Sequence, residues 1–382
     1  MSASVIENAS DVVIVGGGLV GTSTALFLRR RGRSVTLLES GLVGQQASGT
    51  NFGNVRRQGR PLHQLPLANR ANPIWREMKA LMGADVEYLE SGHVRVCYRS
   101  SPELVGELEA YAAEACQAGL ELELLSGDAM RRRFPFLGPE VSAASYSACD
   151  GHANPRLAAP AFARAAVRAG ATVCENARVA VVEKNGEDFR AVCDDGRAFR
   201  APVLLVAAGA WGSLLSSQFR EPVPVVVRGP TMSVTEPVPY GVAPAVGVFT
   251  KASSESVYFR QIPRGNVIIG GGPRADAHLD FRRAKVDPRN TLHQFHQLGR
   301  LAPALARLNV IRVWSGVEGY TPDALPVMGP SGGTGGLYYA FGFSGSGFQI
   351  APAVGEVMAE LIDTGTTAID LAPYRVSRFG AA

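Results

Sequence analysis

The chain of 382 residues has no apolar run near the roughly 20 residues that a membrane-spanning helix needs. The apolar segment VLLVAAGAW, residues 203–211, is less than half that length. Five dispersed cysteines form no CxxC pair, and six histidines show no metal-ligand spacing. We therefore expect reduced thiols, no metal site, no transmembrane segment and a cytoplasmic location.

Charge is also scarce, since charged residues make up 19% of the chain and the net charge is +4. The arginine clusters at 29–31, 131–133 and 282–283 lack interleaved aromatic residues. This pattern favours solvated helix faces over nucleic-acid binding. The length suggests two closely joined domains with a sizeable core.

What the sequence does contain is a strand–turn–helix–strand unit near its amino terminus. Val12–Val15 predicts a buried parallel strand, and Gly16, Gly18 and Gly21 match GxGxxG. Such glycines permit a tight turn, close approach to a pyrophosphate, and packing of the helix on the strand. Glu39 ends the second strand, where a carboxylate binds ribose hydroxyls and repels a 2′-phosphate. The unit therefore predicts a site for NAD or FAD rather than NADP.

The rest of the chain alternates between two kinds of sequence pattern. Residues 86–98 alternate like a pair of strands, and 179–211 predicts short strands with turns at Asn185-Gly186 and Asp195-Gly196. Prolines and β-branched residues at 222–263 predict an antiparallel sheet. We expect an α/β fold with α+β elements, in which a discontinuous Rossmann-type dinucleotide domain is interleaved with an antiparallel β-rich substrate domain. The expected ranges are 1–84, 150–220 and 315–382 for the first domain, and 85–149 and 221–314 for the second.

A second glycine-rich stretch, FGFSGSGFQ at 341–349, precedes a predicted helix that starts at Phe348. Backbone amides and a helix N-terminus carry partial positive charge, which suits the N1–C2=O edge of a reduced flavin. The alternative is a glycine loop that simply closes the last strand.

The GxGxxG unit with Glu39, VLLVAAGAW and WSGVEGYTPDALPVMGP…GLYYAFGFSGSGFQIAPAVGE together resemble the FAD-dependent D-amino-acid oxidase (DAO) superfamily. The match is to its glycine-oxidase and sarcosine-oxidase-like branch and covers nearly the whole chain in order. DGHANP at 150–155, SGTNFGNVRRQGR and SGSGFQ are most similar to β subunits of opine, proline or hydroxyproline dehydrogenases.

This resemblance implies an extended FAD, with adenine reached by the backbone of Val179. Some relatives tether FAD through a cysteine where this chain has Glu318, so we expect non-covalent FAD. The cofactor-binding residues implied are Gly16, Gly18, Leu19, Val20, Gly21, Glu39, Ser40, Ala47, Ser48, Gly49, Thr50, Asn51, Gly53, Asn54, Val179, Ala208, Gly209, Trp211, Gly345, Ser346, Gly347, Phe348 and Gln349.

The resemblance also implies oxidation of the C–N bond of an amino or imino acid, such as an opine, proline, hydroxyproline or N-alkyl amino acid. Hydride would pass from Cα to flavin N5, and the resulting imine would be hydrolysed to an oxo acid. This chemistry depends on positioning, and an arginine fork suits the substrate carboxylate. The flavin-side loop offers Arg56, Arg57 and Arg60. We favour Arg56 as the clamp and then Arg260, the alternative for each being a structural ion pair.

Two further groups are candidates for the substrate site. Glu318 would bind a cationic part of the substrate or pair with an arginine of the chain. Tyr258 and Tyr320 would donate phenolic hydrogen bonds, unless they are core aromatics.

The electron acceptor follows from the scarcity of lysine. Oxygen-using relatives place a lysine over the flavin, whereas the matching strand NVIIGGG has none and Gln349 stands where many relatives carry one. This favours a dehydrogenase that passes electrons to a partner subunit or quinone, in a hetero-oligomer. The alternatives are an oxidase of glycine, sarcosine or D-amino acids that uses O2 and releases H2O2, an NAD-linked dehydrogenase, and a non-catalytic FAD-binding subunit.

Overall fold

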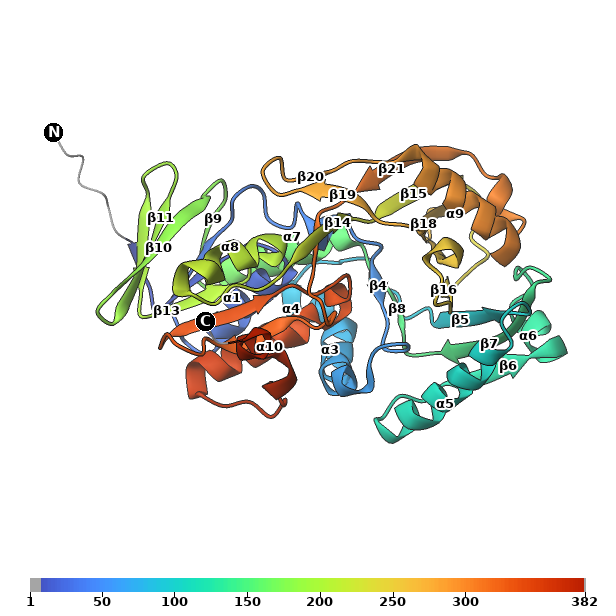
Figure 1. Cartoon of the computed structure of the whole chain (residues 1–382), viewed down its shortest axis with the longest axis horizontal. Coiled ribbons are helices and arrows are strands. Elements are labelled where there is room, and N and C mark those ends of the chain that lie inside the picture. The colour runs from blue at the N-terminus through green and yellow to red at the C-terminus, as the bar shows by residue number, and fades with distance from the viewer. Residues whose placement is uncertain (1–7, 381–382) are drawn as a thin grey trace.

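The strand–turn–helix–strand unit lies at the centre of a six-stranded sheet in the computed structural model, which describes residues 8–380 (Figure 1). The strands from β24 to β9 are parallel, and β23 closes one edge in the antiparallel direction. The order is β23 (Val327–Pro330), β24 (Leu337–Phe341), β13 (Val203–Val206), β2 (Val12–Val15), β3 (Val35–Leu38) and β9 (Thr172–Cys174). Three distant parts of the chain therefore build one sheet.

Helices pack on one face of this sheet, where Ile14, Leu37 and Leu205 belong to the same buried core. These helices are α1 (Leu19–Arg30), α3 (Leu65–Arg76), α4 (Met78–Met82), α7 (Pro155–Arg168) and α10 (Gly347–Thr364). The contact between α1 and α10 is close, because a Cβ on Gly355 would lie 2.2 Å from Oγ of Ser23. A helix from the amino-terminal part of the chain, α1, therefore packs directly against one from the carboxyl-terminal part, α10.

The opposite face of the six-stranded sheet is covered by a smaller sheet. Val13, Val15 and Leu204 pack there, which explains the unbroken apolar runs of β2 and β13. The smaller sheet comprises β1 (Asn8–Ala9), β12 (Ala198–Ala201), β11 (Asp188–Cys193) and β10 (Val179–Asn185). The predicted turns are confirmed, since Gly186 and Gly196 adopt positive φ between antiparallel strands.

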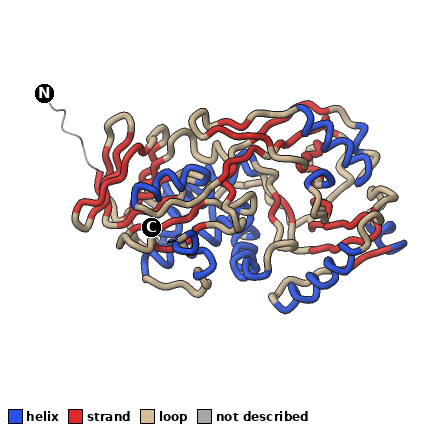
Figure 2. The backbone as a smooth tube through the Cα atoms, viewed as in Figure 1, coloured by secondary structure: helices blue, strands red, loops and turns tan. Residues whose placement is uncertain are grey.

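An eight-stranded sheet forms the other half of the molecule (Figure 1). It is antiparallel except for one parallel pair, β16 with β5. The order is β21 (Val310–Ser315), β15 (Thr231–Pro237), β18 (Asn266–Gly271), β17 (Val257–Gln261), β16 (Ala245–Val248), β5 (His93–Tyr98), β7 (Val141–Ser147) and β6 (Glu123–Ser126). The helices of this half, coloured blue in Figure 2, are α5 (Glu103–Gln117), α6 (Gly127–Arg133) and α9 (Pro288–Leu301). The last of them packs on the face of the sheet across β15, β18 and β17.

One sequence prediction is wrong in this region, because residues 86–98 contain a single strand, β5 (His93–Tyr98), rather than a strand pair. Residue Leu89 makes only an isolated bridge to His152. The partners of β5 are β7 and β16, which come from much later in the chain, so the local alternation did not reveal them.

Short elements connect the two halves. The strands β4 (Asn54–Val55) and β8 (Gly151–His152) pair with each other between them, and α2 (Ala47–Thr50) precedes β4. The remaining elements are α8 (Gly212–Ser216) and a four-stranded sheet of β20 (Arg283–Ala284), β19 (Ala275–His278), β14 (Val226–Gly229) and β22 (Glu318–Tyr320). The mixed α/β architecture is as predicted, while the exact domain ranges stay a prediction. Within residues 8–380, no helix has the length and apolar character to cross a membrane.

Candidate functional site

A cavity of about 870 Å³ extends from the carboxyl ends of β2 and β3 to the face of the eight-stranded sheet. Its volume lies in the range of sites that bind small molecules and cofactors. Residues from both ends of the chain line it, including Gly16 after β2 and Gly347 at the start of α10. We call the portion lined by Glu39 and the two glycine turns, around Gly16 and Gly345, the glycine end, and the portion lined by Arg56 and Tyr258 the arginine end.

The glycine end is shaped by the turn between β2 and α1. Gly16 has a φ of +116°, and a Cβ there would lie 2.4 Å from the carbonyl oxygen of Ala207. A Cβ on Gly21 would lie 2.0 Å from the carbonyl oxygen of Gly16. Only glycine allows this close packing of the helix on the strand. Gly18 offers no side chain to cap α1, and Oγ of Ser48 accepts only the N–H of Leu19, so other first-turn amides are available to a ligand.

Glu39 lies beside this turn and lines the cavity. Its Oε2 accepts the N–H of Gly17 at 2.7 Å, and its Oε1 accepts the N–H of Gly41 at 2.8 Å. These bonds hold the carboxylate at the end of β3. The predicted contact of Glu39 with a ribose stays a prediction, and the same oxygens retain lone pairs for it.

A second helix N-terminus reaches the cavity from the far end of the sequence. Gly345, with a φ of +76°, and Ser346 lead into α10, and Ser346 makes no side-chain cap. Gln349 donates from Nε2 to the carbonyl of Ala68 at 2.9 Å, while its buried Oε1 has no partner among the described residues. The indole N–H of Trp75 donates to the carbonyl of Gln349 at 2.7 Å. Two helix N-termini whose own N-cap residues make no side-chain hydrogen bond therefore open into one cavity, which suits an extended dinucleotide.

Most of the residues predicted for the site are brought together. Those that line the cavity are Gly16, Gly18, Leu19, Val20, Glu39, Ser40, Ala47, Ser48, Asn51, Asn54, Arg56, Val179, Ala208, Gly209, Trp211, Tyr258, Glu318, Gly345, Ser346, Gly347, Phe348 and Gln349. Five predicted residues lie outside the lining, namely Gly21, Gly49, Thr50, Gly53 and Arg260. Trp314 donates from its indole N–H to the carbonyl of Thr50 at 2.8 Å, which fixes that segment behind the cavity wall.

Arg260 is the second candidate for the carboxylate clamp, and the structure places it away from the cavity. Its Nε donates to the carbonyl of Phe52 at 2.7 Å, and its Nη1 lies 3.0 Å from Nδ1 of His152. Burial lowers the pKa of Arg260 to about 9 and, with Arg260, lowers that of His152 to about 3. The segment around Phe52 covers Arg260 and separates it from the lining, so its observed role is structural.

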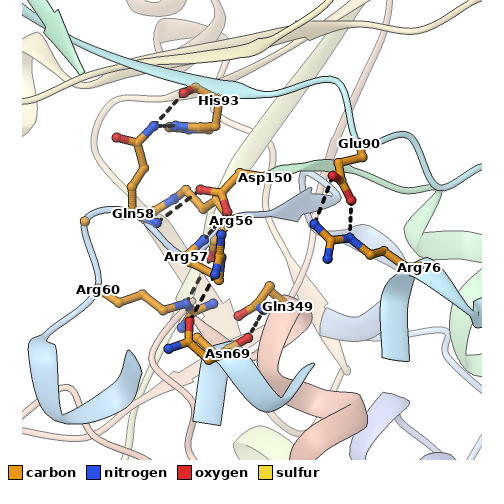
Figure 3. A network of polar contacts seen from close by, with 12 residues as sticks. Arg56, Arg57, Gln58, Arg60, Asn69, Arg76, Glu90, His93, Asp150 and Gln349 are labelled. Atoms are coloured by element: carbon orange, nitrogen blue, oxygen red, sulfur yellow. Dashed lines mark hydrogen bonds and ion pairs between the residues drawn. The ribbon is translucent and has the colours of Figure 1, made fainter. Parts of the chain in front are cut away.

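The three arginines of the predicted flavin-side loop have different surroundings (Figure 3). Arg57 pairs with the fully buried Asp150, whose carboxylate also accepts the backbone N–H groups of Arg57 and Gln58. Arg60 donates to the carbonyl of Ser346 at 3.0 Å and so joins this loop to the start of α10. The side chain of Arg56 donates only to the carbonyl of Gln58 among the described residues. Arg56 therefore keeps donors for a ligand, whereas Arg57 does not line the cavity.

The sequence analysis missed His93 and Arg95, which enter the cavity from β5. Gln58 donates from Nε2 to the carbonyl of His93 at 2.6 Å, and its Nε2 also lies 2.8 Å from the ring nitrogen Nδ1. Burial, Arg56 and Arg95 hold the pKa of His93 well below its ordinary value, so the ring is neutral. No local motif marks these residues, because their place depends on which strands pair with β5.

Opposite this loop, Tyr320 donates its hydroxyl to the carboxylate of Glu318. The guanidinium of Arg274 lies 4.5 Å from the centroid of the Tyr320 ring. Burial raises the pKa of Glu318, against the lowering effects of Tyr320 and Arg274. Glu318 makes no ion pair with an arginine of residues 8–380, so the alternative of a direct arginine pair is not seen. Burial and Glu318 raise the pKa of Tyr258 to about 12.

Comparisons with known proteins agree with this arrangement. A model of the FAD dependent oxidoreductase family (DAO) matches residues 11–361. Glycine oxidase of Geobacillus kaustophilus (strain HTA426) is 27% identical over 379 residues, covering 96% of this chain and 97% of that protein. The B subunit of opine oxidase from Rhizobium meliloti is 29% identical over 383 residues, covering 97% and 98%. The crystal structure of L-proline dehydrogenase from P. horikoshii matches with a TM-score of 0.90 at 26% identity, over 98% of each chain.

Proposed function

This chain belongs to the FAD-dependent oxidoreductase (DAO) family, and we propose that it oxidises the C–N bond of an amino or imino acid. Candidate substrates are secondary amines such as opines, proline, hydroxyproline or N-alkyl amino acids, in line with the names of its relatives. The observation that carries the proposal is one cavity with two helix N-termini at the glycine end and Arg56 at the arginine end.

The glycine end would hold FAD largely through backbone amides, with Glu39 as the predicted contact of the ribose. Amides at the start of α1 face the place of a pyrophosphate, and those around Gly345 and Gly347 face the place of the flavin ring. We propose that the cofactor is not covalently attached, because Glu318 stands where some relatives carry the tethering cysteine. Acid precipitation tests this point, since it should leave free FAD in the supernatant and a colourless pellet.

FAD, when bound, supplies a two-electron acceptor. The protein's own task is then to hold the substrate. Arg56 would grip the carboxylate with two N–H donors, and Tyr258 would donate its phenolic hydrogen to the same end of the substrate. Glu318, opposite Arg56, would accept a hydrogen bond from the substrate amine and so orient its lone pair. Positioning of this kind removes much of the entropic barrier to reaction.

The electron acceptor is proposed to be a partner subunit or a quinone rather than O2. Among the described lining residues there is no lysine, so the lysine whose charge favours electron transfer to O2 in some relatives has no counterpart in this lining. Two relatives are named as components of larger enzymes, the B subunit of opine oxidase and the HcnC subunit of hydrogen cyanide synthase, which supports a hetero-oligomer. The rival is an oxidase that releases H2O2, and several relatives bear the name glycine oxidase.

One experiment tests the proposal as a whole. The purified yellow protein is mixed anaerobically with a panel of imino acids, N-methyl amino acids and opines, and the flavin absorbance is followed. Bleaching by at least one secondary amine supports the function, whereas a flavin that stays oxidised with every member supports a non-catalytic role. Oxygen uptake by the reduced protein, with and without an added quinone, then separates oxidase from dehydrogenase.

A further inference from the structure

A row of residues crosses the eight-stranded sheet next to the cavity. The strand register places side by side Met232, Gly270, Tyr258, Gly247, Arg95 and Ser145. Directly paired residues in neighbouring strands point to the same face of a sheet. Tyr258 and Arg95 therefore flank Gly247 on the cavity side, and all three line the cavity.

The space above Gly247 is open. The ring of Tyr258 leans the other way, over Gly270, where a Cβ would lie 2.2 Å from it. A Cβ on Gly247, by contrast, would meet only the Cβ of Tyr258, at 3.4 Å. A strip of bare backbone thus separates the phenol from the guanidinium and leaves room for a ligand group between them.

The wall of this space carries positive charge, and neither Arg56 nor Arg95 forms an ion pair with an acid of residues 8–380. A Cβ on Gly59 would lie 2.6 Å from Nη1 of Arg95 and 3.1 Å from Nη1 of Arg56, so the two guanidinium groups approach each other beside the backbone of Gly59. The carboxylate of Asp150 is already bound to Arg57 and two backbone N–H groups. Like charges held together in a partly buried place are costly unless an anion lies between them.

The side chain of Arg95 makes no hydrogen bond to any of residues 8–380, although its backbone is paired within the sheet. Its guanidinium stacks on Phe249, 4.0 Å from the ring centroid, which fixes its direction. Burial and Arg56 lower its pKa to about 10, so it remains charged at neutral pH. A partly buried cation that keeps its donors unpaired is suited to a carboxylate, since a planar fork can bind both oxygens.

We infer that Arg95 and Gly247 form a second carboxylate pocket, so that the preferred substrate is a secondary amine that carries two carboxylates. One carboxylate would lie on Arg56 and the other on Arg95, above the bare backbone of Gly247. The inference rests on the proposed function for the position of the first carboxylate, but the pocket can be tested without catalysis.

The binding experiment uses the flavin-loaded protein with glutarate and butyrate, two unreactive acids that differ by one carboxylate. Perturbation of the flavin spectrum gives their dissociation constants. Glutarate should bind about tenfold more tightly, as expected for one additional charged hydrogen-bonding pair. In Arg95→Leu this advantage should disappear, while butyrate binding should stay within about twofold. Equal affinities of the two acids for the unmodified protein would overturn the pocket.

The reaction provides a second, independent measurement. Anaerobic flavin reduction by iminodiacetate is compared with that by N-methylglycine, which lacks one carboxylate. Arg95→Leu should raise the half-saturating concentration for iminodiacetate about tenfold or more and leave N-methylglycine nearly unchanged. An equal loss for both would show that Arg95 holds the carboxylate common to them, and the two-carboxylate proposal would be wrong.

Two further variants serve as controls for poor folding and for a general loss of positive charge. Gly247→Val fills the open strip without strain, because Gly247 has no positive φ and strands accept β-branched residues. It should reduce glutarate binding as Arg95→Leu does, even if the latter folds poorly. Arg99→Leu removes the same charge from an exposed position just after β5. This variant should still bind glutarate more tightly than butyrate. If no substrate bleaches the flavin but glutarate still depends on Arg95, the pocket stands and the proposed function falls.

Discussion

The two ends of the cavity are built from different materials. At the glycine end, the ligand would meet backbone amides presented by tight turns and two helix N-termini. At the arginine end, it would meet charged side chains supplied by a loop and by neighbouring strands. A backbone site tolerates no added atoms but needs no particular side chain, whereas a side-chain site tolerates exchange and changes its ligand when exchanged. Substitutions at each end, and between them, can break or sharpen this contrast.

The largest effect is expected at Gly21, outside the lining. Gly21→Val places a Cβ 2.0 Å from the carbonyl oxygen of Gly16, so strand and helix must separate. We expect a loss of about 3 kcal/mol in the free energy of unfolding, together with loss of bound flavin. Urea unfolding and the flavin-to-protein absorbance ratio measure both. Gly106→Ala in α5 is the control, because its Cβ meets nothing within 4 Å. Full flavin content in Gly21→Val would contradict the backbone model.

At the arginine end, Arg56→Leu should leave folding and flavin content intact and act on the substrate. Removal of a charged hydrogen-bonding partner should weaken carboxylate binding by about 1.5–3 kcal/mol. The measurement is the substrate dependence of anaerobic flavin reduction. Arg260→Leu is the matched comparison, since that arginine bonds Phe52 and His152 outside the lining. Arg260→Leu should lower thermal stability and leave substrate affinity unchanged. If Arg260→Leu instead weakened substrate binding and Arg56→Leu did not, Arg260 would be the carboxylate clamp and Arg56 the structural residue.

Between the two halves, His152 gives a pH dependence of stability. Its pKa is about 3 in the folded protein and ordinarily 6.5, so below pH 6.5 the unfolded chain binds a proton that the folded protein rejects. Stability is therefore complete above pH 6.5 and falls as the pH drops toward 3, by about 1 kcal/mol per unit. His93 contributes in the same direction. Urea unfolding at pH 7 and pH 5 gives the free energy of unfolding at each pH. This free energy should fall less between the two values in His152→Asn than in the unmodified protein. An equal fall in both proteins would refute the role of His152.

The smallest effect is expected for a side chain that serves the glycine end. Oγ of Ser48 accepts the N–H of Leu19 at 2.8 Å, in the first turn of α1. Ser48→Ala should cost about 0.5–1 kcal/mol of folding free energy, as for a lost helix cap. Flavin should remain bound, with only a small rise in its dissociation constant, which flavin fluorescence titration can measure. Complete loss of flavin would mean that this end depends on side chains after all.

The glycine end could be predicted from sequence because its determinants are local. Gly16, Gly18 and Gly21 are required by one turn, and Gly345 and Gly347 by another, so each motif carries its own geometry. The convergence of the two motifs was predicted from the resemblance to the DAO family. It is seen here as β2 and β24 flanking β13.

The arginine end could not be predicted in full, because its members are brought together by strand register. Arg95 faces Tyr258 across Gly247 only because β16 pairs with both β5 and β17. Arg260 lies two residues after Tyr258 and points to the same face of the strand, yet the segment around Phe52 covers it. Residue type and spacing alone do not reveal such covering.

The position of β24 and α10 also bears on how the protein is made. The β2–α1 turn leaves the ribosome early, but the wall that faces it is completed only when Gly347 and the helix behind it have emerged. During synthesis the nascent chain therefore exposes only part of the cavity wall until α10 has emerged. A nonsense mutation that removes α10 would yield an apoprotein even though every residue of the first motif is present.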